Sequence, residues 1–265
     1  MTALTVLAPP GDEFGAPTPN ELFDLPPIIP GVEWFTKPVL LAALSSILVI
    51  GLCWAAFSKP KIVPRGVQNV VEYGYMFVRD QVARPFLGKD ADRFMGLLLT
   101  LFFLIFVWNL MGVIPLAQFP VASHIAFPAV LAISIYVLKL YLGIKHQGVG
   151  GYFKNMMFPP GLPKPIYVLL SPIEFLSNMI IAPFTHAVRL FANMFAGHML
   201  LAFFSMVGFW FLFEKLTPLG AGVGVLGVVM TIIFTAFEIF IQFLQAFLFA
   251  MLASMYIGGS LHAEH

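Results

Sequence analysis

The stretch Arg189-Leu-Phe-Ala-Asn-Met-Phe-Ala-Gly-His198 decides how this chain is interpreted. Arg189 opens it, near the middle of an apolar segment that runs from about Tyr167 to Phe213. A guanidinium stays protonated at any accessible pH, and placing one at bilayer depth costs about 3 kcal/mol or more. The sequence therefore predicts that another group compensates the charge of Arg189.

The composition is that of an integral membrane protein. Of the 265 residues, 60% are hydrophobic and only 10% are charged, whereas soluble domains carry about a quarter charged residues. The net charge of +1 gives no reason to expect a nucleic acid as partner. The single cysteine, Cys53, excludes an intrachain disulfide. No zinc-type Cys/His spacing, HExxH motif, GxSxG motif or phosphate-binding glycine loop occurs, so we expect no metal and no cofactor.

Hydropathy predicts an all-α polytopic membrane protein with about five membrane helices. We expect an N-terminal tail over residues 1–37, a single membrane domain over 38–258 and a C-terminal tail over 259–265. The expected spans are 38–58, 94–114, 125–143, 167–213 and 219–258. Valines at helical spacing face polar residues over 66–86, which predicts an amphipathic interfacial helix. The alternative for that helix is packing on other parts of the protein.

The last two apolar segments are each about twice as long as a perpendicular span. Each is either two tightly connected spans or one long helix that is strongly tilted or kinked, with Pro183 as the kink site in the first. Neither segment contains a polar turn, which favours the long helices. The charged turn Glu214-Lys-Leu-Thr-Pro218 separates them, so we predict an antiparallel hairpin.

Charge bias predicts the orientation in the membrane. The segment 59–93 is rich in lysine and arginine, as is 143–164, which we expect to be a Gly/Pro-rich loop containing Lys154. The loop 115–124 contains neither residue type. The positive-inside rule therefore places the N-terminus outside and the basic segments and the C-terminus inside.

Each long segment carries one polar stripe. At about 100° per residue, the first stripe spans an arc of about 100° and consists of Glu174, Asn178, Thr185, Arg189 and Asn193. The second spans about 80° and consists of Thr231, Thr235, Glu238, Gln242 and Gln245. Hydroxyls and amides in such positions can simply bond between helices, and His186, beside the first stripe, can be a satisfied core histidine. Ionisable groups at this depth more often mark an ion pathway.

Folding the hairpin about its turn pairs the two stripes. Residues at equal chain distance from residues 217–218 should lie at similar depth, which pairs Arg189 with Gln245 and His198 with Glu238. By the same rule Asn193 pairs with Gln242. We expect the histidine–glutamate pair nearest the outside and the arginine deeper.

The two remaining polar residues of the first stripe, Glu174 and Asn178, should lie nearest the inside. A carboxylate and an imidazole together can pass a proton, whereas a fixed positive charge repels one. The order predicts two proton half-channels separated by Arg189. At the depth of Arg189 the chain offers only amides, so we expect its partner carboxylate to belong to another polypeptide.

Two motifs resemble subunit a of F-type ATP synthases. The stretch Arg189 to Gly197 is similar to the signature around that family's essential arginine, and Glu238 with Gln245-Ala-Phe is similar to its second signature. Pro64 with Gln68-Asn69 and Glu72, and also Asn109-Leu-Met, resemble further family segments. The resemblance covers about residues 60–258. Gly112 departs from it, because some relatives have an aspartate there.

The resemblance implies a proton-conducting stator subunit of the Fo sector without a catalytic site of its own. Arg189 would face the carboxyl group of a rotating c-ring, beside the rotor-facing polar residues Thr185, Asn193, Gln242 and Gln245. His198 and Glu238 would belong to the outer half-channel, and Glu174 and Asn178 to the inner one.

The partners implied are the ring of c subunits, the b subunit of the peripheral stalk, protons and, indirectly, the F1 sector. We expect a bacterial plasma membrane, with the inner membrane of an organelle as the alternative. A secondary transporter whose Arg189 binds an anion is the alternative. It would show inverted repeats and broken helices, and no internal repeat is visible. An intramembrane protease would need a metal motif or paired aspartates, which are missing.

Overall fold

The computed structural model describes residues 14–58, 63, 65–158, 164–215 and 217–261. All regular elements in these ranges are helical. Five helical stretches are long and apolar enough to cross a membrane, namely Lys37–Phe57, Val67–Leu110, Ala126–Met157, Ile166–Glu214 and Pro218–Leu261. The all-α polytopic prediction is therefore confirmed. Pro64 and the outermost parts of both expected tails lie outside the described residues.

The chain packs as two compact units, whose boundary falls within four helices. The first unit contains α1 (Pro19–Phe23) and parts of α2 (Lys37–Phe57), α8 (Ala182–Phe209) and α9 (Pro218–Leu261). In sequence it comprises the chain up to Ser45, Val107–His124 and Ala192–Leu244. The second unit comprises Ser46–Phe106, Ile125–Phe191 and the chain from Gln245 onward.

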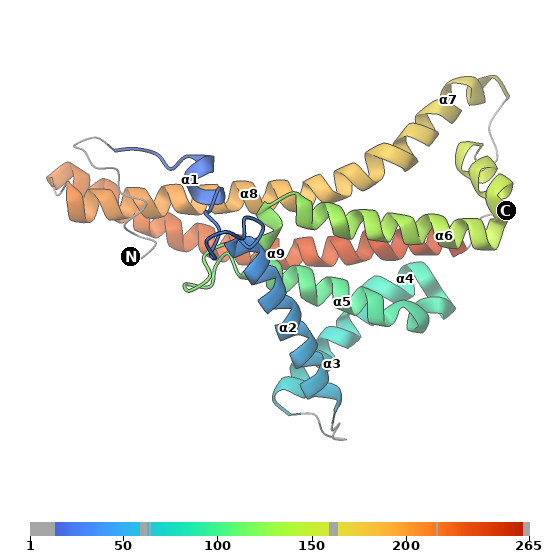
Figure 1. Ribbon diagram of the computed structural model, residues 1–265, viewed down its shortest axis with the longest axis horizontal. Coiled ribbons are helices and arrows are strands. Elements are labelled where there is room, and N and C mark those ends of the chain that lie inside the picture. Colours follow the sequence, from blue (N-terminus) through green and yellow to red (C-terminus); the bar gives the residue numbers. More distant parts are fainter. Residues whose placement is uncertain (1–13, 59–62, 64, 159–163, 216, 262–265) are drawn as a thin grey trace. The chain divides into compact units, whose positions relative to one another are not determined.

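In the first unit, α8 and α9 form an antiparallel hairpin with close backbone contact (Figure 1). The Ser205 hydroxyl donates to the Thr231 hydroxyl at 3.5 Å. A Cβ atom added to Gly227 would lie 2.6 Å from the backbone nitrogen of Gly208. Both pairs are centred close to residue 218, which confirms the hairpin that the sequence predicts.

The helical stretch Ile166–Glu214 is 49 residues long and Pro218–Leu261 is 44, so the long-helix interpretation is correct. The first stretch contains α7 (Lys164–Leu176) and α8, joined by a π turn over Ser177–Ile181. Pro183 follows two residues later. Proline has no N–H to donate, and its ring would clash with the carbonyl four residues earlier, at Met179. The wider π turn accommodates that carbonyl.

This π turn corrects the polar stripe expected on the first long segment. The arc assumed an unbroken α-helix from Glu174 to Asn193, whereas the Ser177–Ile181 turn inserts about one residue, or about 100° of rotation. Glu174 and Asn178 are therefore rotated relative to Arg189. From Thr185 to Asn193 the helix is regular, and the expected arrangement applies.

In the second unit, α3 (Val67–Val78) continues through a π turn (Arg79–Ala83) into α4 (Arg84–Leu87). This is the helix expected over 66–86. Val71, Val78 and Val82 are buried, and Gly74 leaves room for the Phe103 ring of α5 (Ala91–Leu110).

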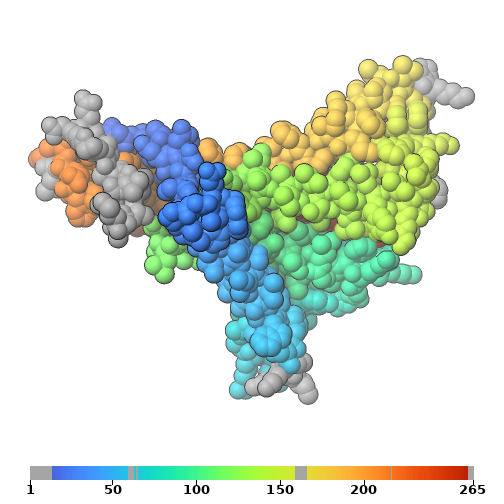
Figure 2. Space-filling model, in the orientation of Figure 1, coloured from blue at the N-terminus to red at the C-terminus, as the bar shows by residue number. Residues whose placement is uncertain are grey.

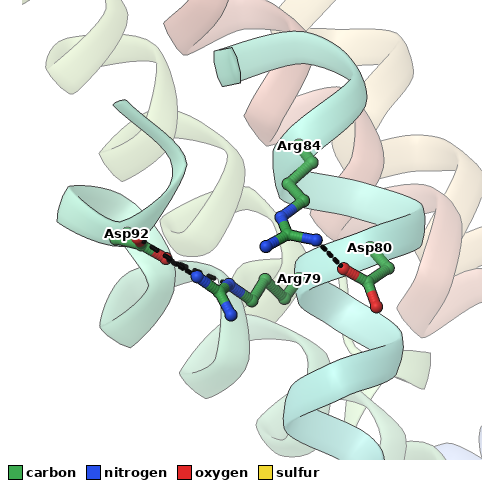
Figure 3. Close-up of polar contacts among 4 residues, drawn as sticks. All are labelled: Arg79, Asp80, Arg84 and Asp92. Atoms are coloured by element: carbon green, nitrogen blue, oxygen red, sulfur yellow. Dashed lines mark hydrogen bonds and ion pairs between the residues drawn. The ribbon is translucent and has the colours of Figure 1, made fainter. Parts of the chain in front are cut away.

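One ion pair joins the π turn to α5, and a second lies within the helix that continues into α4 (Figure 3). The Arg79 guanidinium lies 3.0 Å from the carboxylate of Asp92, and that of Arg84 lies 2.8 Å from Asp80. All four side chains are at least one-third exposed. Exposed pairs contribute about 0–1 kcal/mol, so the buried valines stabilise this hairpin more than its charges do.

The helix α6 (Ala126–Met157) continues past residue 143, where the sequence analysis ends the third span. The expectation that Lys154 lies in a Gly/Pro-rich loop is therefore wrong. Gly148 explains the difference, because its φ of 73° breaks the helix direction at one residue, after which the helix resumes. Glycine adopts this conformation without steric cost.

The close contact of α8 and α9 predicts that a side chain at Gly227 destabilises the hairpin. Gly227→Val should lower the free energy of unfolding by about 1–3 kcal/mol, because the added atoms meet the backbone of Gly208. The measurement is thermal unfolding of the purified chain in detergent, followed by tryptophan fluorescence. Gly222→Val is the matched control on the same helix, since nothing lies within 4 Å of its added Cβ. Equal melting temperatures for both variants would contradict this packing.

Candidate functional site: buried ionisable groups on the two long helices

Arg189 lies in the regular part of α8 that belongs to the second unit, and its side chain is half-buried. Among the described residues, no carboxylate lies within ion-pair distance of its guanidinium. His186 lies one helical turn earlier on the same helix. The charge of Arg189 is thus not compensated by any described part of this chain.

The first unit contains a buried histidine and a buried glutamate. His198 on α8 is 8% exposed and Glu238 on α9 is 4% exposed. Glu238 packs against the backbone beside the histidine, since a Cβ atom added to Gly197 would lie in ordinary contact, 3.6 Å, with its carboxyl carbon. The structure therefore places the two ionisable groups on facing parts of the hairpin.

The polar atoms of this pair are largely unsatisfied within the described chain. Both carboxylate oxygens of Glu238 and Nδ1 of His198 are buried without a hydrogen-bond partner there. Gln242, one turn after the glutamate, is likewise buried, and its amide lies close enough to the Glu238 carboxylate to act on it. Leaving buried polar atoms unpaired costs about 1–3 kcal/mol each, so such a group needs an explanation beyond stability.

An aromatic layer covers the histidine. The ring of Phe23, from α1, lies edge-on to the ring of His198, with 5.8 Å between centroids, and stacks on Phe195 at 4.5 Å. Phe119 lies on the same imidazole at 6.4 Å. Figure 2 shows the N-terminal residues in blue on the surface of this unit. The layer covers one side of the His198 ring.

Sequence reasoning missed this N-terminal cover, although a local motif signals it. Thr18-Pro-Asn-Glu21 has the spacing of a capping box, with proline at the first helical position. The Thr18 backbone N–H donates to the Glu21 carboxylate at 3.0 Å. That bond, and then the Thr18 hydroxyl, hold the pKa of Glu21 below its ordinary value. The motif predicts a helix start, and α1 then presents Phe23 to the protein.

A second polar group lies in the second unit, where α6 meets α7 and its π turn. The Asn178 side-chain amide donates to the Glu174 carboxylate at 2.9 Å. The Tyr136 hydroxyl of α6 donates to the backbone carbonyl of Asn178 at 2.7 Å and contacts Sδ of Met179 at 2.9 Å. The two residues predicted for the inner half-channel are thus hydrogen-bonded to each other. Tyr136, which the sequence analysis did not single out, fixes their backbone.

The residues expected to face a rotor differ in exposure. Thr185 is exposed and its hydroxyl donates to the carbonyl of Ile181 at 2.7 Å, while Asn193 is half-buried. Gln245 is 6% exposed and Gln242 is fully buried. Thr185 and Asn193 can therefore face a partner directly, whereas Gln242 is placed to contact groups inside the hairpin.

Comparison with known proteins agrees with this arrangement. Residues 39–258 match the ATP synthase A chain family. The chain is 48% identical to ATP synthase subunit a of Streptomyces lividans over 88% of this chain and 81% of that protein. The identity to the subunit a of Frankia alni is 45% over 88% and 80% of the two chains, and to that of Rhodococcus erythropolis 39% over 99% and 95%.

The chain belongs to the ATP synthase A chain family, whose members are the proton-translocating stator subunit of the Fo sector. It is an integral membrane component of an F-type ATP synthase and has no catalytic site of its own.

The hydrogen bond of Tyr136 predicts a measurable contribution to stability. Tyr136→Phe should lower the free energy of unfolding by about 1 kcal/mol, because it leaves the Asn178 carbonyl without that donor. In a chain of this size the melting temperature should fall by about 2–4 °C, measured in detergent. Tyr141→Phe, on the exposed side of the same helix, is the control and should not shift it. Equal shifts for both variants would show that the bond contributes nothing.

Proposed function

We propose that this chain forms two offset proton half-channels against a c-ring, with Arg189 as the fixed charge between them. The observation that carries the proposal is a guanidinium within an apolar helix that has no carboxylate partner in the described chain. A carboxylate on another polypeptide, about 4 Å away, would attract it by about 4 kcal/mol at an effective dielectric constant of about 20. That attraction is comparable to the cost of about 3 kcal/mol for inserting the arginine.

The outer half-channel consists of His198 and Glu238. Their unsatisfied, buried polar atoms are suited to accept and release a proton, and Phe23 and Phe119 cover one side of the His198 ring. A proton delivered from this pair neutralises a ring carboxylate. Only the neutral carboxyl group can then leave the stator for the lipid, because a charged one would be too costly there.

Arg189 acts where a ring carboxyl returns to the stator and releases its proton. A protonated ring carboxyl that arrives from the lipid meets the guanidinium, which stabilises the ionised form and so favours release of the proton. The proton leaves through the inner half-channel, past Glu174 and Asn178. The fixed charge of Arg189 prevents a direct passage between the two half-channels.

The proposal includes the partners and the orientation. Thr185 and Asn193 face the c-ring, the b subunit of the peripheral stalk holds this chain, and the F1 sector is coupled indirectly. The N-terminus lies outside and the C-terminus in the cytoplasm of a bacterium, with the chain in the plasma membrane. Protons, and no organic cofactor, are what the chain handles.

Neutralising Arg189 is expected to abolish coupling without preventing assembly. In the ATP synthase reconstituted in liposomes, Arg189→Ala should lower proton-driven ATP synthesis by about three orders of magnitude, because an interaction of about 4 kcal/mol is lost. ATP hydrolysis by the F1 sector should continue without proton pumping. Arg93→Ala is the control, since Arg93 is an exposed arginine of the second unit.

Retention of proton-driven synthesis by Arg189→Ala would refute the proposal. Liposomes that contain this chain alone provide a second test. Uptake of an organic anion that depends on Arg189 would support the transporter alternative instead.

Exchanging the two ionisable groups of the outer half-channel should preserve function. His198→Glu alone leaves two carboxylates in this buried part of the hairpin and Glu238→His alone leaves two imidazoles, so each should lower ATP synthesis by about tenfold or more. The double variant restores one carboxylate and one imidazole and should return to within about threefold of the wild type. A double variant no better than the poorer single variant would show that the two groups act independently.

A further inference from the structure

His186 is a buried imidazole that the half-channels described above do not use. It lies on α8 in the second unit, one helical turn before Arg189, and is 4% exposed. Both ring nitrogens are buried without a hydrogen-bond partner in the described part of the chain. The sequence left open a satisfied core histidine at this position. The structure shows no described group that satisfies it.

The surroundings of His186 are aromatic on one side and positively charged on the other. The ring of Phe249 lies 3.9 Å away and that of Tyr256 lies 5.9 Å away, measured between centroids. Arg189 lies one helical turn further along α8. A neutral imidazole can accept a proton at one nitrogen and donate one from the other.

A continuous series of contacts leads from His186 to the inner polar group. Beyond Tyr256, the Lys139 ammonium of α6 lies 5.0 Å from the centroid of the tyrosine ring and 5.3 Å from that of Tyr136. The Tyr136 hydroxyl in turn donates to the carbonyl of Asn178. All these residues belong to the second unit.

The series ends at the Glu174 carboxylate, which accepts from the Asn178 amide. It therefore connects the neighbour of Arg189 to the proposed inner exit by way of α9 and α6. Lys139 is only 8% exposed and has no carboxylate within ion-pair distance in the described chain. Its cation–π contacts with both tyrosine rings hold them on either side of the ammonium.

We propose that His186 is a proton-relay residue at the start of the inner half-channel, between Arg189 and the Glu174–Asn178 pair. The inference rests on the proposed function, which supplies the proton. A ring carboxyl that meets Arg189 releases its proton through water to one nitrogen of the neutral imidazole. The other nitrogen gives its own proton to water on the side of Tyr256 and Lys139. The imidazole is then neutral again with its tautomer exchanged, and rotation of the ring restores it.

A histidine that only fills space would respond differently to substitution. Replacing it by an apolar side chain removes two unsatisfied buried nitrogens, so packing alone predicts unchanged or higher stability and unchanged proton conduction. A relay predicts that conduction falls even when stability rises. The two roles are therefore separated by measuring both quantities on the same variants.

The experiment uses the complete ATP synthase with variant chains, reconstituted in liposomes. After removal of the F1 sector, passive proton conduction is measured under a potassium diffusion potential at a series of pH values on the inner side. His186→Leu and His186→Gln should each lower conduction by about 100-fold, the usual contribution of a positioned proton-transfer group. Both should also lose one titrating group from the dependence on inner pH.

His146→Gln is the matched control, because His146 is an exposed histidine of the same unit. It should conduct within about twofold of the wild type. The melting temperature of each assembled variant shows whether a loss reflects unfolding, and the polar His186→Gln serves where the leucine variant assembles poorly.

Two results would overturn the inference, and they differ in scope. If His186→Leu and His186→Gln conduct like the wild type while Arg189→Ala still abolishes coupling, His186 only packs and the proposed function stands. If Arg189→Ala retains coupling, the proposed function fails and the relay fails with it.

Discussion

The fixed charge of Arg189 is the constraint on which the rest of this protein depends. A guanidinium cannot be neutralised by losing its proton, so its insertion into an apolar helix must be offset by a charge of opposite sign. The described chain provides none within ion-pair distance. Under the proposed function a partner supplies that charge. A partner carboxylate that can move and change its protonation state then couples the compensation of Arg189 to the movement of protons.

Two helices, one of which carries Arg189, remain long and continuous although each contains a proline. Pro85 and Pro183 each follow a π turn by two residues, Arg79–Ala83 and Ser177–Ile181 respectively. Each turn absorbs the missing donor and the carbonyl clash without ending the helix. Arg189 is thereby held on a regular stretch of α8, while the glutamate and asparagine of the inner group lie before the turn and take a different rotation.

Much of the fold could be predicted because its determinants are local. The apolar lengths predict the five membrane-spanning stretches, and the single charged turn predicts the register that Gly208 and Gly227 show. The length of α6 could not be predicted in this way, because Gly148 and its neighbouring glycines are typical of loops. The π turn before Pro183 could not be predicted either. It depends on how the helix accommodates the clash between the proline ring and a backbone carbonyl, and a hydropathy profile carries no information on that.

The candidate site likewise has one part that the sequence predicts and another part that it does not. Equal chain distance from the turn is enough to predict that His198 and Glu238 lie on facing parts of the hairpin. The cover by Phe23 comes from a distant segment, and the lack of partners around His186 is a property of its neighbours on other helices.

His198 and His186 resemble each other in position and in hydrogen bonding. Each is a buried imidazole on α8, one before and one after the arginine in sequence, and each has at least one ring nitrogen without a described partner. A group that must bind and release protons cannot be fully satisfied by fixed hydrogen bonds, because those bonds would stabilise one protonation state over the other. Under the proposed function, the unsatisfied nitrogens on both sides of the permanent charge of Arg189 allow each half-channel to bind and release protons.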